Sequence, residues 1–246
     1  MPIQVNLDNI AIVLHRPKFP ENIGASARAA CNMGISQLVV VEPLNCDLTR
    51  VLRMATHFAA DIVENMALYE DLETALAPFQ YIVGTTARVG SRRPTIANPR
   101  ELARKLIPIS QKNRIALVFG PEDAGLTTAE LGLCQAVVTI PTADFSSLNL
   151  AQAIVVLCYE VFTASRNDVT SFTPRLASRE ELEAMYAQLK EVFVNIDFIN
   201  PENPDYWMQH IRRFFSRIDM RARDVRMIRG ICRQIEWYGS RNMDKG

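Results

Sequence analysis

The feature that most constrains this chain is a series of five short apolar runs separated by segments with helical periodicity. The runs are Ile10–Leu14, Leu38–Val41, Tyr81–Val83, Ile115–Phe119 and Ala136–Ile140. Apolar runs of this length, bounded by polar, glycine or proline residues, are typical of strands that are buried on both faces. Strands that alternate with helices form a mostly parallel sheet covered by helices on both sides. The sequence therefore predicts an α/β fold.

The segments between these runs carry the helical pattern. Helices are expected at Ile23–Met33, Val63–Ala77, Pro99–Ile107, Thr127–Leu133 and Leu148–Thr163. Periodicity is then lost in a stretch rich in serine, asparagine, aspartate and proline, which is typical of a linker. We therefore expect an α/β domain over residues 1–165 and a linker over residues 166–177.

A second region begins after this linker, over residues 178–246. Ser178 is followed three residues later by Glu181, which is a capping-box pattern for a helix start. Asn203 and Pro204 predict another helix start, with asparagine at the cap and proline in the first turn. Apolar residues recur at helical spacing after each start and again from Val225 onward. The sequence predicts a small all-helical extension.

Composition restricts the class of protein. A hydrophobic content of 48% and a charged content of 22% are ordinary for a globular protein. The sequence has no long apolar run and no basic, apolar leader at its start, so we expect neither a membrane span nor a secretory signal. Its five cysteines form no C-x-x-C pair, which fits reduced thiols in the cytoplasm. The three histidines do not cluster with them, so we expect no metal site.

Charge is distributed unevenly although the formal net charge is +0. Between Tyr206 and Asn242 there are nine arginines and three acidic residues. Two interpretations stay open for this stretch. It can bind a phosphate backbone, with aromatic residues available for stacking, or it can be a solvated helix face whose arginine stems cover apolar surface. The interleaved aromatic residues are Trp207, Phe214, Phe215, Trp237 and Tyr238.

Four segments of the α/β region carry residues suited to ligand binding. They are FPENIGASARAACNMG (19–34), VGTTARVGSRRP (83–94), LVFGPEDAGL (117–126) and IPTADFSSLNLAQAI (140–154). The last three begin at predicted strand ends, where open α/β sheets bind their ligands. Taken singly, each is also typical of a turn or of a helix cap, as with Ser146 and Ser147 before the last helix. None of the four matches the P-loop or the dinucleotide-binding pattern.

The order of three motifs is more specific than any one of them. N-x-G-x-x-x-R at Asn22, Gly24 and Arg28, then FGPE-x-x-GL, then SSLNLA, resembles the SpoU (TrmH-like) RNA 2′-O-ribose methyltransferases of the SPOUT superfamily. The segments LEAMYAQL, IRRFFSR and MIRGICRQIE resemble the helical extension of the TrmJ-type tRNA (cytidine/uridine-2′-O-)-methyltransferases. The resemblance implies a trefoil knot at the C-terminal side of the sheet domain. Pro121 and Asp123 depart from residues frequent in relatives, which leaves their side-chain contacts open.

The resemblance also implies a function. It implies methylation of a ribose 2′-hydroxyl in tRNA, at the cytidine or uridine of position 32 in the anticodon loop, with S-adenosyl-L-methionine as the methyl donor. It further implies a cytoplasmic homodimer. Two alternatives stay open: a 2′-O-methyltransferase that acts on ribosomal RNA, and a non-catalytic RNA-binding homologue.

Site residues follow from the same resemblance. The implied cofactor-binding residues are Thr85, Thr86, Ala87, Gly120, Ile140, Ser147, Leu148 and Asn149. The implied catalytic residues are Asn22, Arg28, Glu122, Ser147 and Asn149, and the expected RNA-binding residues are Arg28, Arg213, Arg217 and Arg221. We also expect a bulky residue at Gly120 to block the cofactor without disturbing the fold.

Arg28 is an unusual residue in its helix, because its neighbours are alanine, glycine and serine. A guanidinium hardly loses its proton, so we expect Arg28 to hold a phosphate and the developing alkoxide rather than to act as a base. The small residues around it are expected to let the partner subunit of a homodimer approach closely. The alternative is a structural ion pair on an alanine-rich helix.

Overall fold

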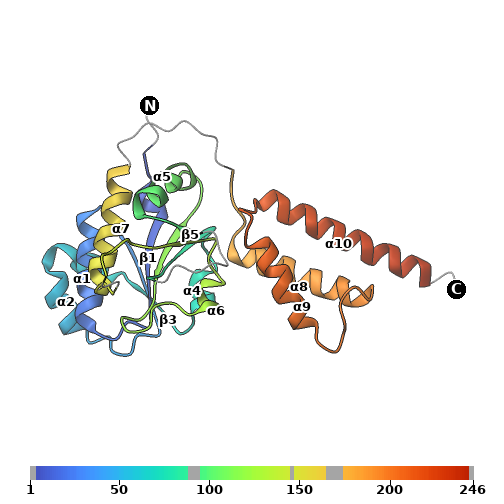
Figure 1. Cartoon of the computed structure of the whole chain (residues 1–246), viewed down its shortest axis with the longest axis horizontal. Helices are drawn as coiled ribbons and strands as arrows, with labels where there is room; N and C mark the ends of the chain where they lie inside the picture. Colours follow the sequence, from blue (N-terminus) through green and yellow to red (C-terminus); the bar gives the residue numbers. More distant parts are fainter. Residues whose placement is uncertain (1–3, 88–94, 145–146, 165–173, 244–246) are drawn as a thin grey trace. The chain divides into compact units, whose positions relative to one another are not determined.

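A computed structural model describes residues 4–87, 95–144, 147–164 and 174–243. The chain divides into two compact units, Met1–Pro174 and Arg175–Gly246, and each is described by itself (Figure 1). Most of the predicted linker lies outside the described residues. Its last residues belong with the second unit, because Ala177 N donates to Met220 O and Ala222 N donates to Arg175 O.

The first unit is built on a parallel sheet. The described residues form seven strands in the order β3-β2-β1-β6-β4-β7-β5, and every pairing among them is parallel. The strands are β1 (Ile10–His15), β2 (Gln37–Val41), β3 (Ala67–Tyr69), β4 (Tyr81–Thr85), β5 (Thr95–Ile96), β6 (Ile115–Phe119) and β7 (Ala136–Val138). All residues of the central strands β1 and β6 are buried. The predicted α/β class with a mostly parallel sheet is confirmed, whereas the knot stays a prediction.

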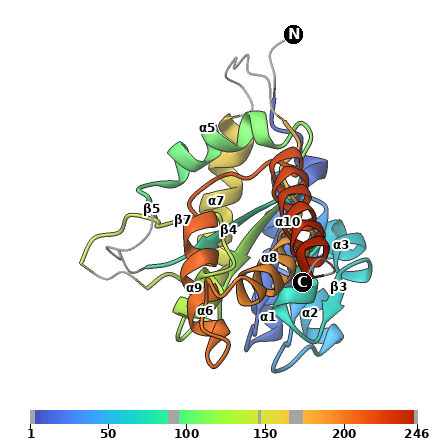
Figure 2. The ribbon, with the colours of Figure 1, turned by 90° about the vertical axis from the view of Figure 1, so that its right-hand side faces the viewer.

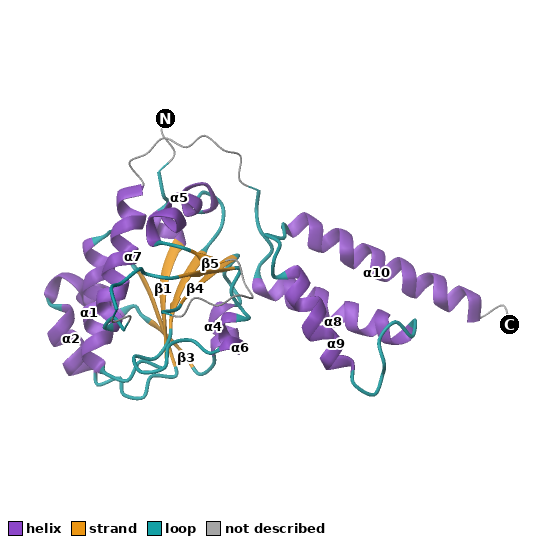
Figure 3. Ribbon diagram, in the orientation of Figure 1, coloured by secondary structure: helices purple, strands orange, loops and turns teal. Residues whose placement is uncertain are grey.

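Helices cover both faces of this sheet (Figures 1 and 3). One face carries α1 (Pro20–Asn32), α2 (Leu48–Ala55), α5 (Pro99–Ile109) and α7 (Leu150–Ala164), which pack against one another. The other face carries α4 (Leu72–Leu76) and α6 (Thr128–Leu131), whose apolar side chains join those of β1, β2, β4 and β6 in one buried cluster. The short helices η1 (Leu7–Asn9), η2 (His57–Ala59) and α3 (Ala60–Glu64) complete the unit.

The predicted helix Val63–Ala77 is wrong. This segment contains the end of α3, then strand β3, then α4. Asn65 follows α3 directly, and the Asp71 carboxylate accepts a hydrogen bond from Thr74 N at 2.7 Å, which starts α4 as a new helix. Between these polar residues, β3 pairs with β2. Helix α2 and strand β5 were not predicted at all.

The small residues of α1 serve a contact within the chain. A Cβ atom on Gly24 would lie 2.1 Å from the carbonyl oxygen of Val51 in α2. Ser26, Ala27 and Ala30 are fully buried inside the unit as well. At Gly24 the small residue is therefore required by the packing of α2, whereas the approach of a partner subunit to this helix stays a prediction.

The second unit contains α8 (Arg179–Asn195), α9 (Pro204–Phe215) and α10 (Ala222–Met243), and α8 packs against both of the others (Figure 2). Both predicted helix starts are confirmed. Ser178 and Glu181 form a reciprocal capping box, and the Asn203 side chain accepts a hydrogen bond from Tyr206 N. The core joins apolar side chains of α8, Met208 of α9 and Val225 of α10.

Candidate active site

A cavity of about 290 Å³ lies at the carboxyl ends of β4, β6 and β7. Parallel pairing places these ends side by side, with Gly84 opposite Val118 and Thr85 opposite Val138. The cavity is lined by seven of the eight residues predicted to bind the cofactor, namely Thr85, Thr86, Ala87, Gly120, Ile140, Ser147 and Leu148. The eighth, Asn149, does not line it. The three strand-end motifs thus meet at one cavity.

The FGPEDAGL segment forms one wall of the cavity as a tight turn. Gly125 N donates to Pro121 O at 2.8 Å, and Gly125 has a φ of 65°, which favours glycine. A Cβ atom on Gly120 would lie 2.4 Å from both Gly125 C and Leu126 N. The expectation that a bulky residue at Gly120 would leave the fold intact is therefore wrong, because this turn has no room for a side chain there.

Three of the predicted catalytic residues form one hydrogen-bond network. Asn22 Nδ2 donates to Glu122 Oε1 at 2.7 Å, and Asn149 Nδ2 donates to Asn22 Oδ1 at 3.1 Å. The second oxygen of Glu122 accepts from Lys18 N at 2.9 Å. This network joins the start of α1, the loop after β6 and the start of α7, so it connects the three motifs that identified the site.

Asn149 has a second task at the start of α7. Its Oδ1 accepts hydrogen bonds from Ala151 N at 2.9 Å and from Gln152 N at 3.4 Å, which is the pattern of a helix cap. The sequence favoured Ser146 and Ser147 for this task. Ser146 lies outside the described residues, and Ser147 is exposed at the edge of the cavity. Capping fixes the Asn149 amide in place for its bond to Asn22.

Lys18 was missed by sequence reasoning. Its Nζ forms an ion pair with Asp123 Oδ2 at 2.6 Å, in addition to the backbone bond to Glu122. The hydrogen bond from Lys18 lowers the pKa of the Asp123 carboxyl. Asp123 lines the cavity. The sequence did not indicate what its side chain contacts, and the structure shows that it contacts a lysine of the β1–α1 segment. No motif marks Lys18, and only the fold brings the two residues together.

Arg28 lies on α1, six residues after Asn22, and its side chain is exposed. It does not line the cavity. Within the described part of the chain, its side chain forms no hydrogen bond or ion pair. The alternative, a structural ion pair, is therefore not supported, because Arg28 has no acidic partner among the described residues. A role of Arg28 in RNA binding or catalysis stays a prediction.

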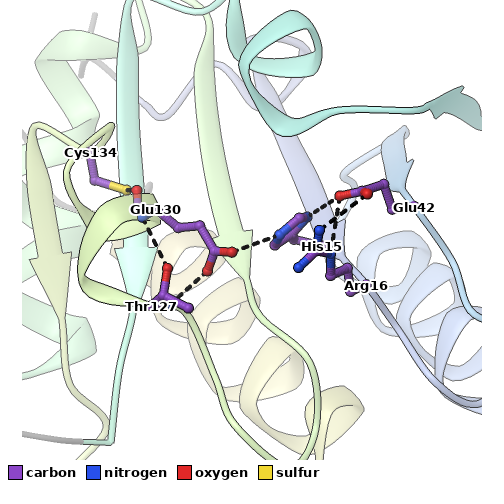
Figure 4. Close-up of polar contacts among 6 residues, drawn as sticks. All are labelled: His15, Arg16, Glu42, Thr127, Glu130 and Cys134. Carbon is purple, nitrogen blue, oxygen red and sulfur yellow. Dashed lines mark hydrogen bonds and ion pairs between the residues drawn. The ribbon is translucent and has the colours of Figure 1, made fainter.

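At the end of β1, a buried histidine connects this strand to α6 (Figure 4). His15 is 3% exposed, and its Nε2 lies 3.0 Å from Glu130 Oε1, while its Nδ1 lies 4.0 Å from Glu42 Oε2. Glu130 also closes a capping box with Thr127, next to cavity residue Leu126. Partial burial acts to raise the pKa of Glu130, but the hydrogen bonds from Thr127 and His15 together lower it.

The arginines of the helical unit fall into two groups. Arg212 pairs with Glu183 at 2.6 Å and lies over the Tyr186 ring, so it fits the structural interpretation. The guanidinium groups of the three predicted RNA-binding residues, Arg213, Arg217 and Arg221, are exposed and have no partner among the described residues. They are available to an anionic ligand.

Two kinds of feature are absent from the part of the chain that the structure describes. No group of three or more histidine, cysteine, aspartate or glutamate side chains is arranged to hold a metal ion. In the same residues, no helix has the length and apolar character needed to cross a membrane.

Fold and motif positions agree with comparisons to known proteins. Residues 9–159 match the SpoU rRNA Methylase family, and residues 180–245 match the C-terminal domain of the tRNA methyltransferase TrmJ. The first match covers more than half of the chain. The chain therefore belongs to the SpoU rRNA methylase family, as the sequence motifs predicted.

Particular relatives narrow this assignment. The chain is 36% identical over 244 residues to the tRNA (cytidine/uridine/adenosine-2′-O-)-methyltransferase TrmJ of Pseudomonas aeruginosa, with 94% of this chain and 95% of the relative covered. It resembles the crystal structure of TrmJ from Z. mobilis ZM4 with a TM-score of 0.77 at 28% identity, covering 92% of this chain and 98% of the other. A probable methylase family protein from Haemophilus influenzae gives a TM-score of 0.62 at 28% identity, covering 96% and 99%.

Proposed function

We propose that the protein uses S-adenosyl-L-methionine to methylate a ribose 2′-hydroxyl of tRNA, at the cytidine or uridine of position 32 in the anticodon loop. One observation carries the proposal. The cavity lies where the three family motifs meet, in a chain that aligns with TrmJ proteins through both of its units. A cytoplasmic location is part of the proposal, because the substrate is tRNA.

The lining of the cavity suits a nucleoside that carries positive charge. Val138, Ile140 and Leu148 supply apolar surface for an adenine ring, and the bare backbone at Gly120 permits close approach. The Glu122 carboxylate also lines the cavity and can offset positive charge, because its two hydrogen-bond donors are neutral groups, whereas Asp123 is already paired with Lys18. When bound, S-adenosyl-L-methionine supplies a methyl group activated by its sulfonium.

The chain's own residues orient the acceptor. A neutral hydroxyl is a weak nucleophile, so positioning and stabilisation of the developing alkoxide matter most. The guanidinium of Arg28 is exposed and can hold a phosphate and that alkoxide. Both Glu122 oxygens already accept hydrogen bonds, so Glu122 holds Lys18 and Asn22 in place. Asn149 holds Asn22 from the other side.

The proposed active form is a homodimer through the α/β unit. Its support is an exposed apolar stripe on α7, where Val155 is 43%, Tyr159 is 52% and Phe162 is 40% exposed. Their spacing places them on one face of the helix. Light scattering of the purified protein at micromolar concentration should give twice the chain mass, and a monomer with or without cofactor would contradict this part of the proposal.

The methyl acceptor can be tested directly. Purified protein with labelled S-adenosyl-L-methionine should label unmodified tRNA, and mass spectrometry of nuclease fragments should place a 2′-O-methyl group at position 32. Ribosomal RNA is the competing substrate in a parallel reaction. Label in ribosomal RNA alone, or no label with either RNA, would overturn the proposal.

A variant with a matched control tests the cavity as the cofactor site. Ala153 lines the cavity from α7 and is half-buried, whereas Ala151 is half-buried on the same helix without lining it. Ala153→Phe should weaken binding of S-adenosyl-L-methionine in calorimetry by about tenfold or more, because the ring fills space that the ligand needs. Ala151→Phe should bind as the wild type does. Equal affinities for both variants would place the cofactor elsewhere.

A further inference from the structure

Helix α9 has two faces of different character. On the inner face, Met208 is 4% exposed and packs into the core of the helical unit together with Ile211 and Phe215. On the outer face, Trp207 is 47% and Phe214 is 59% exposed. Large aromatic side chains at such exposure contribute little to this core. Exposed aromatic surface of this kind is typical of a site that binds a partner molecule.

The outer side chains form a ladder of rings along the helix. Trp207, His210 and Phe214 are spaced by three and four residues, which places them on one side of the helix. The Tyr206 and His210 ring centroids lie 5.0 Å apart, and those of Trp207 and His210 lie 6.5 Å apart. Phe214 continues the ladder one turn further along, about 6 Å by the rise of a helix. The face therefore offers several adjacent ring surfaces.

Positive charge runs along the same face. Arg213 follows His210 by three residues, and Arg217 follows Phe214 by three. Both are exposed and without an ion pair among the described residues. At the start of the helix, the carboxylate of Asp205 is paired with Lys190 at 2.7 Å. The face thus alternates exposed rings with unneutralised cations.

We infer that this face of α9 stacks on unpaired bases of the RNA substrate while Arg213 and Arg217 hold the adjoining phosphates. The inference rests on the proposed RNA substrate and adds that the recognised part is single-stranded. Every base has a face on which an aromatic ring stacks, but within a duplex neighbouring bases already cover that face. A second copy of this chain fits the face less well, because a two-fold interface would set the arginines of both copies against one another.

The intrinsic fluorescence of the full chain tests the inference. The chain has two tryptophans, so Trp237→Phe leaves Trp207 as the single reporter. A single-stranded oligouridylate should quench it, and a self-paired RNA duplex of equal length should not. Filter binding, which does not depend on the tryptophan reporter, measures the variants: Trp207→Ala and Phe214→Ala should each weaken single-strand binding by about tenfold or more, with an unchanged salt dependence, because stacking contributes no counterion release.

Phe198→Ala is the matched control, because Phe198 is 65% exposed in the same unit but contacts Phe193 instead of the α9 ladder. It should bind oligouridylate as the wild type does. Equal quenching by both RNAs, or unchanged affinity in the α9 variants, would overturn the inference. So would a changed oligomeric mass of those variants with unchanged affinity. Methyl transfer to tRNA without quenching would contradict this inference alone, and quenching without methyl transfer would contradict the proposed function alone.

Discussion

The strand-end site and the outer surface of the helical unit differ in whether their polar side chains have partners within the protein. At the site, Asn22 is hydrogen-bonded to both Glu122 and Asn149, and Lys18 forms an ion pair with Asp123. On the helical unit, the guanidinium groups of Arg213 and Arg217 have no partner among the described residues. Groups that satisfy one another hold a fixed geometry, as positioning of a reaction requires. Free surface cations instead exchange counterions for phosphate. We propose that the first region sets the rate of the reaction and that the second sets the affinity for RNA.

The largest expected effect comes from Arg28. Arg28→Ala should reduce single-turnover methylation by about 10²–10³-fold, the usual cost of removing one group that stabilises the transition state. Because Arg28 is exposed and its side chain has no partner among the described residues, the thermal stability of the variant should stay near that of the wild type. Rapid-quench kinetics together with calorimetry check both. A variant that melts early but reacts at the normal rate when folded would restore the structural interpretation.

Neutralising the exposed arginines should act on affinity. Arg213→Gln, Arg217→Gln and Arg221→Gln combined should weaken tRNA binding. The salt dependence should flatten by roughly 0.7–0.9 in slope for each phosphate that the variant no longer neutralises. Arg175→Gln is the control, because that guanidinium is already paired with Glu181. Filter binding over a range of salt concentrations measures the slope, and an unchanged slope in the triple variant would assign these arginines to a solvated face.

Asn149 allows its two tasks to be separated. Asn149→Ala should lower the free energy of unfolding by about 1 kcal/mol through loss of the α7 cap, and it should also lower activity. Asn149→Ser keeps an oxygen cap but lacks the amide that donates to Asn22, so it should restore stability without restoring activity. Denaturant unfolding and initial rates check this pair. Recovery of both properties in the serine variant would show that the bond to Asn22 is dispensable.

The smallest effect concerns acid stability. Hydrogen bonds from Thr127 and His15 lower the pKa of Glu130 below its ordinary value of 4.5. The contribution of Glu130 to stability is therefore present above about pH 4.5 and is lost as the pH falls through the lowered value. Glu130→Gln should destabilise the protein near neutral pH and lose less stability on acidification than the wild type. If the free energy of unfolding falls by the same amount in both proteins on acidification, Glu130 does not have this role.

Long apolar patterns predicted much of the fold, whereas several short elements were not predicted from the sequence. Strands β1 and β6 and helix α10 have strong, local signals that tertiary contacts only reinforce. Strand β3 has three residues and depends on pairing with β2, so nothing local distinguishes it from a helix. The cavity lining was predictable from motif order at strand ends. Lys18 was not, because its partner Asp123 lies 105 residues away in the sequence.

The most direct test of the division between rate and affinity is the single-turnover rate as a function of tRNA concentration. The arginine triple variant should require more tRNA but reach the wild-type rate at saturation. Arg28→Ala should stay slow at every tRNA concentration. If the triple variant remains slow at saturation by the same factor as Arg28→Ala, the two regions do not divide the work between rate and affinity.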